Sequence, residues 1–253
     1  MGSFLDYCPR NPSWKWLEER PDCISDSRRS LLTAFCYRQI MSRAPSLCGV
    51  ILAAGASTRM GRDKALLPWP PNDPLGGSFL SAAIRLLTAQ TDLVIVVAGA
   101  NALQLEPVIY AEGAFLVENS TPDLGQFSSL RVGLQDVLSR GRDAAVVTLV
   151  DRPPVQPATL QALLVAFESA INQNKWAVVP EFGGKHGHPI VVGREMIEAF
   201  LRAPASSNAR EVRHARQEFI EYVPVDDPFV TLNVDTPEDY TALAGSAPIT
   251  TQH

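Results

Sequence analysis

Short, largely apolar runs with the length of buried strands alternate with segments of helical periodicity, and this alternation restricts the folds open to the chain. Apolar runs occupy residues 48–53, 92–98 and 144–150, and amphipathic segments separate them. Strands that lack a polar face are buried on both sides of their sheet. Such strands, alternating with helices, predict an α/β fold in which helices cover a mostly parallel sheet.

The remaining predicted elements continue the same alternation. Apolar side chains at helical spacing predict further helices at 78–90, 102–111, 126–138, 157–171, 195–202, 208–217 and from Thr236 onward. Apolar runs between turn residues predict further strands at 114–117, 176–180, 189–192, 219–225 and 230–234. We therefore expect a single Rossmann-like three-layer domain over residues 46–253.

Residues 1–45 differ in composition from the rest and show no sustained periodicity. They hold three of the four cysteines among scattered proline, tryptophan and charged residues. One interpretation is an N-terminal extension that is loosely docked or disordered. The other interpretation, which we favour, is that this segment arises from an upstream start codon and that the natural chain begins at Met41.

Composition argues against several classes of protein. The formal net charge is −5 and the chain has no basic stripe, so we expect no nucleic-acid partner. No apolar run approaches the roughly 20 residues of a transmembrane helix, so we expect no membrane partner. The four cysteines form no C-x-x-C pair, which argues against a zinc site or a disulfide framework. We expect a cytoplasmic protein in which Cys48 is a small core residue.

The segment after the first predicted strand combines small residues with cations. It reads LAAGASTRMGRDK from Leu52 to Lys64. Ligands of open α/β sheets bind beyond the carboxyl ends of the strands, and small residues let backbone N–H groups approach a phosphate chain. Arg59, Arg62 and Lys64 supply three cations within six residues. Because neither a Walker loop nor a G-x-G-x-x-G fingerprint is present, we expect a different type of polyphosphate-binding loop.

Asp151 follows a strand of small and branched apolar residues and precedes Arg152 and Pro153. A carboxylate at the carboxyl end of a strand suits Mg²⁺, which prefers one or two carboxylates together with phosphate oxygens and water. Asp235 lies at a predicted strand-to-helix junction, where it could join Asp151. The chain therefore has two carboxylates that are candidates for a magnesium site.

The loop closely resembles the L-A-(A/G)-G-x-S-x-R-M-G-x-x-K signature of the molybdenum cofactor cytidylyltransferases and guanylyltransferases, which belong to the nucleoside-triphosphate transferase superfamily. The resemblance covers residues 47–245, because further family motifs follow in the expected order. These are N-S-T-P-D-L-G at 119–125 with the serines after it, V-D-R-P at 150–153, G-H-P at 187–189 and N-V-D-T-P-E-D at 233–239. The resemblance implies the fold of the nucleotide-diphospho-sugar transferases.

The resemblance also implies the residues of the nucleotide site. It gives catalytic roles to Arg59, Lys64 and Asp151. It places the nucleotide against Leu52, Ala53, Ala54, Gly55, Ser57, Arg59, Met60, Gly61, Lys64, Asn119 and Ser129.

For the metal and the acceptor, the resemblance implies a smaller set of residues. Mg²⁺ would be held by Asp151 and Asp235, with Asn233 as an alternative or additional ligand. His188 and Arg210 would contact the acceptor. The chain departs from the family pattern at Val150, where the family has glycine, and at Ser206 and Ser207. Further departures at Ser120 and Leu124 replace a proline and an aromatic residue.

The predicted activity is transfer of a nucleoside monophosphate to a phosphorylated acceptor, with release of pyrophosphate. Ala54 favours CTP, whereas the G-R-D-K sequence at 61–64 is similar to the guanylyl branch. We favour CTP and molybdopterin, with a molybdoenzyme as a candidate protein partner. GMP transfer to molybdenum cofactor and UMP or CMP transfer to a sugar phosphate are the enzymatic alternatives. A non-catalytic protein that binds nucleotide or molybdenum cofactor and delivers it to an enzyme is the alternative from another class.

Overall fold

The computed structural model describes residues 46–55, 57–71 and 76–246 of the 253-residue chain. The extension predicted over residues 1–45 and the alternative start at Met41 therefore lie outside the described residues. In the described part of the chain, no helix has the length and apolar character needed to span a membrane.

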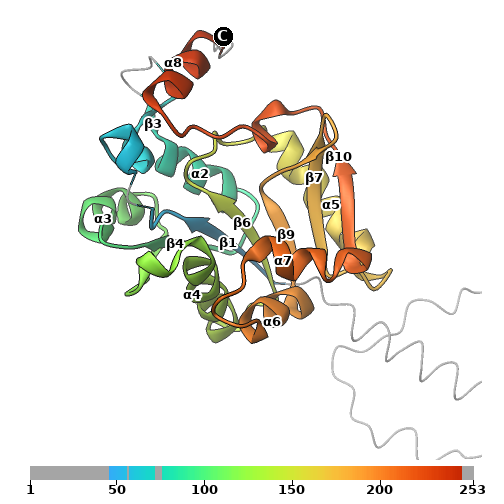
Figure 1. Ribbon diagram of the computed structural model, residues 1–253. Helices are drawn as coiled ribbons and strands as arrows, with labels where there is room; N and C mark the ends of the chain where they lie inside the picture. Colours follow the sequence, from blue (N-terminus) through green and yellow to red (C-terminus); the bar gives the residue numbers. More distant parts are fainter. Residues whose placement is uncertain (1–45, 56, 72–75, 247–253) are drawn as a thin grey trace, which may run out of the picture. The chain divides into compact units, whose positions relative to one another are not determined.

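The centre of the structure is a mixed but mostly parallel sheet (Figure 1). Its strands within the described residues are β1 (Leu47–Leu52), β4 (Leu93–Ala98), β5 (Phe115–Glu118), β6 (Ala144–Leu149), β7 (Ala177–Phe182), β8 (Lys185–His186), β9 (Ile190–Gly193) and β10 (Ile220–Pro224). Their order is β10-β7-β9-β6-β1-β4-β5, and β8 pairs with β7. Among these strands, only β9 and β8 run antiparallel to their neighbours.

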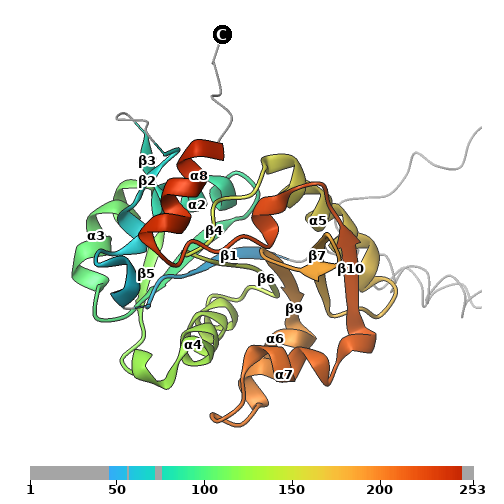
Figure 2. The same ribbon diagram turned by 45° about the horizontal axis from the view of Figure 1, so that its top comes forward.

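Helices cover both faces of this sheet, so the domain has three layers (Figure 2). On one face, α2 (Phe79–Thr88), α3 (Ala102–Ala111) and α5 (Pro157–Ile171) bury one hydrophobic cluster against the strands. On the other face, α4 (Gln126–Ser139), α6 (Arg194–Arg202) and α7 (Ala209–His214) bury a second cluster. The alternation of inward side chains along β1 contributes residues to both clusters, which is why its sequence has no polar face.

A third, smaller cluster anchors the loop that follows β1. Met60 packs with Leu67, Phe79, Val234 and Leu243, joining this loop to α2 and to the last helix, α8 (Pro237–Ser246). The short antiparallel pair β2 (Pro68–Trp69) and β3 (Gly77–Ser78) lies beside it, with Trp69 packed against the cluster. Segments from both ends of the domain therefore hold the loop in place.

Most predicted elements are present, but the prediction of a strand at 230–234 is wrong. Here the chain forms a short 3₁₀ helix, Pro228–Val230, and then continues without pairing in the sheet. Val230 and Val234 are nevertheless fully buried. Their apolar character therefore reflects contact with the core rather than a place in the sheet. Elsewhere Cys48 is a free, buried residue of β1, as predicted.

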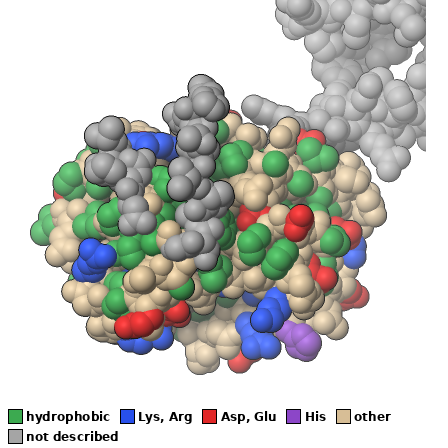
Figure 3. Space-filling model, turned by 90° about the horizontal axis from the view of Figure 1, so that it is seen from above, with side chains coloured by type: hydrophobic (Ala, Val, Ile, Leu, Met, Phe, Trp, Pro, Cys, Tyr) green, Lys and Arg blue, Asp and Glu red, His purple; other side chains and the backbone are tan. Residues whose placement is uncertain are grey.

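The surface is chemically mixed on the side shown in Figure 3. Basic, acidic and apolar side chains are interspersed there, and the basic ones form small separate groups.

Candidate functional site

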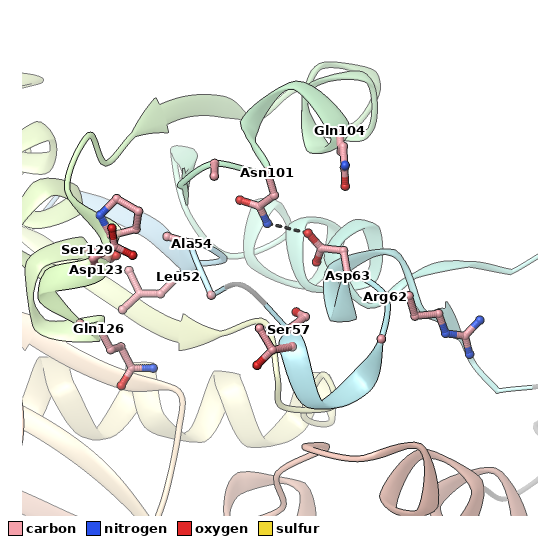
Figure 4. A pocket seen from close by; sticks show the side chains of 16 residues that line it. Leu52, Ala54, Ser57, Arg62, Asp63, Asn101, Gln104, Asp123, Gln126 and Ser129 are labelled. Atoms are coloured by element: carbon pink, nitrogen blue, oxygen red, sulfur yellow. Dashed lines mark hydrogen bonds between the residues drawn. The ribbon is translucent and has the colours of Figure 1, made fainter.

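A cavity of about 660 Å³ lies at the carboxyl ends of the central strands (Figure 4). It is bounded by the loop after β1, the start of α3 and the start of α4. The lining residues are Leu52, Ala54, Gly55, Ser57, Thr58, Gly61, Arg62, Asp63, Ala100, Asn101, Gln104, Pro122, Asp123, Gly125, Gln126 and Ser129. This is the edge at which open α/β sheets bind ligands.

A second cavity, of about 220 Å³, adjoins the first and contains most of the charged candidates. Its lining residues are Leu52, Gly55, Ser57, Thr58, Arg59, Lys64, Gln126, Val150, Asp151 and Asp235. The two cavities share the lining residues Leu52, Gly55, Ser57, Thr58 and Gln126, so they form one continuous site. The structure therefore brings Lys64 and Asp151, which come from different strand ends, into the same cavity.

The loop after β1 turns back on itself and brings Lys64 to the smaller cavity. Ser57 has a left-handed backbone with φ 50°, and its Oγ accepts a hydrogen bond from the Lys64 backbone N–H at 3.2 Å. A 3₁₀ helix, Thr58–Met60, follows and ends at Gly61, whose φ of 70° favours glycine. Left-handed backbone at a residue other than glycine is uncommon and often occurs at functional sites.

The start of α4 adds backbone donors to the same site. Gly125 precedes the helix, and within the described residues no side chain caps its first N–H groups. Gly125 and Gln126 line the larger cavity. The N-terminus of a helix carries unpaired N–H groups and a partial positive charge, which favour an anion.

Two cations share one carboxylate in the smaller cavity. Lys64 Nζ lies 2.6 Å and Arg59 Nη2 lies 3.2 Å from Asp235 Oδ1. The Lys64 side chain is only 11% exposed, whereas that of Arg59 is 70% exposed. The Lys64–Asp235 pair is therefore the better shielded from solvent and the stronger of the two.

Asp151 differs from Asp235 because one of its oxygens has no partner. Its Oδ1 is buried and accepts no hydrogen bond from the described residues. Burial raises the pKa of the Asp151 carboxyl, and the charges of Lys64 and Arg152 oppose that rise. The Asp151 carbonyl accepts a hydrogen bond from Val234 N–H at 2.8 Å, which fixes Asp235 beside it.

This pair of carboxylates fits a hard divalent cation. A buried carboxylate oxygen without a hydrogen bond is unfavourable unless a cation completes it. Mg²⁺ takes one or two carboxylates and leaves its other positions to phosphate and water. The described residues contain no group of three or more His, Cys, Asp or Glu side chains able to hold a metal. Such a cation would therefore take its further oxygens from phosphate or water.

The structure places the predicted nucleotide residues in three groups. Arg59 and Lys64 line the smaller cavity. Those that line the larger cavity are Leu52, Ala54, Gly55, Ser57, Gly61 and Ser129. Three others act behind it. Ala53 O accepts a hydrogen bond from Asn101 Nδ2 at 2.9 Å, and the Met60 side chain lies in the third hydrophobic cluster. Asn119 is buried and donates to the hydroxyls of Ser128 and Ser129.

Asn101 and Asp63 belong to the larger cavity but were missed in the sequence. Asn101 Nδ2 donates to Asp63 Oδ2 at 2.6 Å, as Figure 4 shows. Thr58, Gln104, Asp123 and Gln126 also line the cavity. The position of Asn101 just after the apolar strand β4 was a usable signal, because β4 and β1 end at the same edge of the sheet.

The predicted metal and acceptor residues differ from one another in burial and location. Asp235 lines the smaller cavity, whereas Asn233 is exposed. His188 is half-buried, with Nδ1 3.4 Å from the Val147 carbonyl. Burial and the charges of Arg152 and Arg213 lower the pKa of His188 to about 3, so its imidazole is neutral at pH 7. Arg210 is exposed on α7.

Comparison with known proteins identifies the family. The model of the MobA-like NTP transferase domain matches residues 49–220. The chain belongs to this family. The match confirms the predicted nucleotidyltransferase family and the α/β fold with its mostly parallel sheet.

Relatives in this family span most of the chain. A probable molybdenum cofactor guanylyltransferase from Mycobacterium avium is 28% identical over 206 residues, 81% of this chain and 98% of the relative. The molybdenum cofactor cytidylyltransferase of Escherichia coli is 24% identical over 193 residues, 76% of this chain and 92% of the relative. A protein named nicotine blue oxidoreductase from Paenarthrobacter nicotinovorans is 29% identical and matches 79% and 97% of the two chains.

A solved relative adds one observation on metals. The crystal structure of Rv0371c from Mycobacterium tuberculosis, in a complex with manganese, has a TM-score of 0.64 and 28% identity to this chain. The match covers 80% of this chain and 100% of Rv0371c. A member of this fold therefore binds a divalent cation.

Proposed function

We propose that this protein transfers a nucleoside monophosphate from a nucleoside triphosphate to a phosphorylated acceptor and releases pyrophosphate. CTP is the proposed donor and molybdopterin the proposed acceptor. The observation that carries this proposal is the shared cavity in which Lys64 and Arg59 face Asp151 and Asp235. Cations for a polyphosphate and carboxylates for its divalent counterion are the two requirements of metal-assisted phosphoryl chemistry.

The residues of the chain bind and orient the triphosphate. Backbone N–H groups at the start of α4 and around Gly55 suit phosphate oxygens, and Lys64 and Arg59 suit the charge that develops on the leaving pyrophosphate. An oxygen of the acceptor phosphate attacks the α-phosphorus in line, and the bond to the pyrophosphate oxygen breaks. Because the nucleophile is already an anion, the reaction needs no strong general base. The chain therefore acts by positioning and by charge stabilisation.

Asp151 and Asp235 would hold Mg²⁺, which would neutralise phosphate charge when bound. Asp235 Oδ1 pairs with both Lys64 and Arg59. Triphosphate oxygens compete for the same two cations. Binding of the nucleotide would therefore release Asp235 from its ion pairs, so that its carboxylate could hold Mg²⁺.

The choice between CTP and GTP rests on Ala54. Ala54 lines the larger cavity, and the L-A-A-G sequence at 52–55 resembles that of the cytidylyl branch of the family, which supports CTP. The names of the relatives include both guanylyl and cytidylyl enzymes, and GMP transfer is the second candidate. Both nucleotides meet the same charged residues.

The test is release of pyrophosphate by the full chain with Mg²⁺, four nucleoside triphosphates and a set of acceptors. The acceptors are molybdopterin, molybdenum cofactor and representative sugar phosphates. We expect turnover with CTP and molybdopterin, and loss of turnover in Asp151→Asn. Turnover with GTP alone would overturn the base assignment and leave the reaction class intact. Nucleotide binding without turnover on any acceptor would overturn the enzyme proposal in favour of a delivery protein.

A further inference from the structure

Three arginines in the described residues have a buried Nε atom with no hydrogen-bond partner. They are Arg142, Arg152 and Arg213. Arg142 is still neutralised, because its Nη1 lies 2.9 Å from Asp92 Oδ2. Arg152 and Arg213 form no ion pair with any carboxylate in the described part of the chain. A guanidinium withdrawn from water without a counter-charge is unfavourable, so a pair of them needs an explanation.

The charges of the two guanidinium groups act on the same imidazole, that of His188. Each of them lowers the pKa of His188, and the charge of Arg213 lowers the pKa of Arg152. Arg210 adds a further positive charge near Arg213. Arg152 follows β6, His188 precedes β9, and Arg213 lies on α7, which is drawn near β9 in Figures 1 and 2. The charged side chains that act on His188 are therefore cationic, and the imidazole itself is neutral.

Contacts with main-chain atoms hold the Arg152 guanidinium in place but leave one of its N–H groups without a partner among the described residues. Arg152 Nη1 donates to the Val230 carbonyl at 2.9 Å, and the His188 N–H donates to the same carbonyl at 2.8 Å. Gly187 packs so closely on Val230 that an added Cβ would lie 2.0 Å from the Val230 oxygen. The guanidinium is thus held from one side, while its Nε is left without a partner.

Arg152 also lies next to the proposed metal site in the sequence. Its nearest opposing charges are Asp151 and Asp235, which raise its pKa without forming an ion pair with it. A divalent cation on those carboxylates would remove this compensation. The need for an anion at Arg152 is therefore greatest when a divalent cation is bound.

We propose that Arg152 and Arg213 together bind the phosphate monoester of the acceptor and hold it beside Asp151. A guanidinium fork matches the oxygens of a phosphate dianion, and two forks satisfy more of them than one. This inference rests on the proposed nucleotidyl transfer, in which the acceptor phosphate supplies the attacking oxygen. It assigns the acceptor phosphate to two arginines for which the family resemblance implied no role, in place of His188 and Arg210.

The test measures binding of inorganic phosphate by calorimetry, so it does not depend on turnover. Every sample carries Lys64→Ala, which weakens phosphate binding in the loop after β1. Into this background we would introduce Arg152→Gln, Arg213→Gln and both together. The matched control is Arg216→Gln, because Arg216 is also half-buried and donates to a carbonyl, that of Val212, at 3.2 Å.

We expect each single variant to weaken phosphate binding roughly tenfold and the control to change it less than about twofold. The double variant should also unfold at a higher temperature in phosphate-free buffer, because two unpaired buried charges are gone. Phosphate affinity that is unchanged in the double variant would overturn the proposal. If a glutamine variant fails to fold, Arg152→Lys and Arg213→Lys keep the charge without the fork and should still weaken binding.

A second measurement separates this inference from the proposed function. In proteins that retain Lys64, the KM for the phosphorylated acceptor should rise in Arg152→Gln and Arg213→Gln, whereas the KM for the nucleotide should not. Equal rises in both KM values would show a general loss of the site and would count against an acceptor role. The protein could bind phosphate through both arginines and yet show no transferase activity. That result would support the anion site and overturn the proposed nucleotidyl transfer.

Discussion

Two aspartates, one fully buried and one with a single buried oxygen, show how the same side chain can serve folding or chemistry. Asp227 is fully buried, and its two oxygens accept hydrogen bonds from Gln156 N–H, Thr159 Oγ and Phe229 N–H at 2.8 to 3.0 Å. Asp151 keeps a buried oxygen with no partner among the described residues. A satisfied carboxylate holds two segments together, whereas an unsatisfied one is ready to bind a cation.

The largest expected effect is the loss of turnover in Asp151→Asn. The amide keeps the shape of the side chain and removes the negative charge that would hold the cation. We expect kcat to fall roughly a thousandfold, or about 4 kcal/mol, as for removal of a metal contact. Pyrophosphate release measures kcat, and circular dichroism checks that the variant is folded. A variant with near-normal turnover would remove Asp151 from the site.

The opposite behaviour is expected at Asp227. Asp227→Ala leaves two backbone N–H groups and one hydroxyl without a partner, so the free energy of unfolding should fall by roughly 3 kcal/mol. Urea denaturation measures this change. Turnover per folded molecule should remain close to that of the natural sequence. A large loss of kcat at full stability would erase the contrast between the two aspartates.

The two cations that share Asp235 provide a smaller contrast. Lys64 is shielded and Arg59 is mostly exposed, so Lys64→Ala should lower kcat about a hundredfold and Arg59→Ala only about tenfold. Steady-state pyrophosphate release compares the two variants. The opposite ranking would show that exposed Arg59 moves onto the triphosphate and makes the stronger contact.

The smallest expected effect is on the pH dependence of stability. The pKa of Asp151 is raised in the folded protein. At pH values between the ordinary pKa and the raised pKa, the folded state therefore binds more protons than the unfolded state. Its contribution to stability therefore falls as pH rises through that window, and Asp151→Asn should remove this fall. Urea denaturation at a series of mildly acidic pH values compares the two proteins. Parallel curves would show that the carboxyl has an ordinary pKa.

The loop from Leu52 to Lys64 and the positions of Asp151 and Asp235 could be predicted from the sequence. Each of them follows a strand or precedes a helix, and such junctions at one edge of a parallel sheet come together in space. Asn101 and Asp63 could not be paired in this way, because their hydrogen bond depends on how α3 packs against the loop. The segment 230–234 was misassigned because apolar residues can be buried without pairing in a sheet.

The sequence by itself determined the layered fold, the family and the position of the candidate polyphosphate loop after β1, since periodicity and local motifs act over short distances along the chain. Only the tertiary structure decided which polar groups have partners. It satisfied Asp227 and left an oxygen of Asp151 and the buried Nε atoms of Arg152 and Arg213 without a partner among the described residues. The physical reason is that burial and pairing depend on neighbours distant in the sequence, and the sequence pattern does not contain those neighbours.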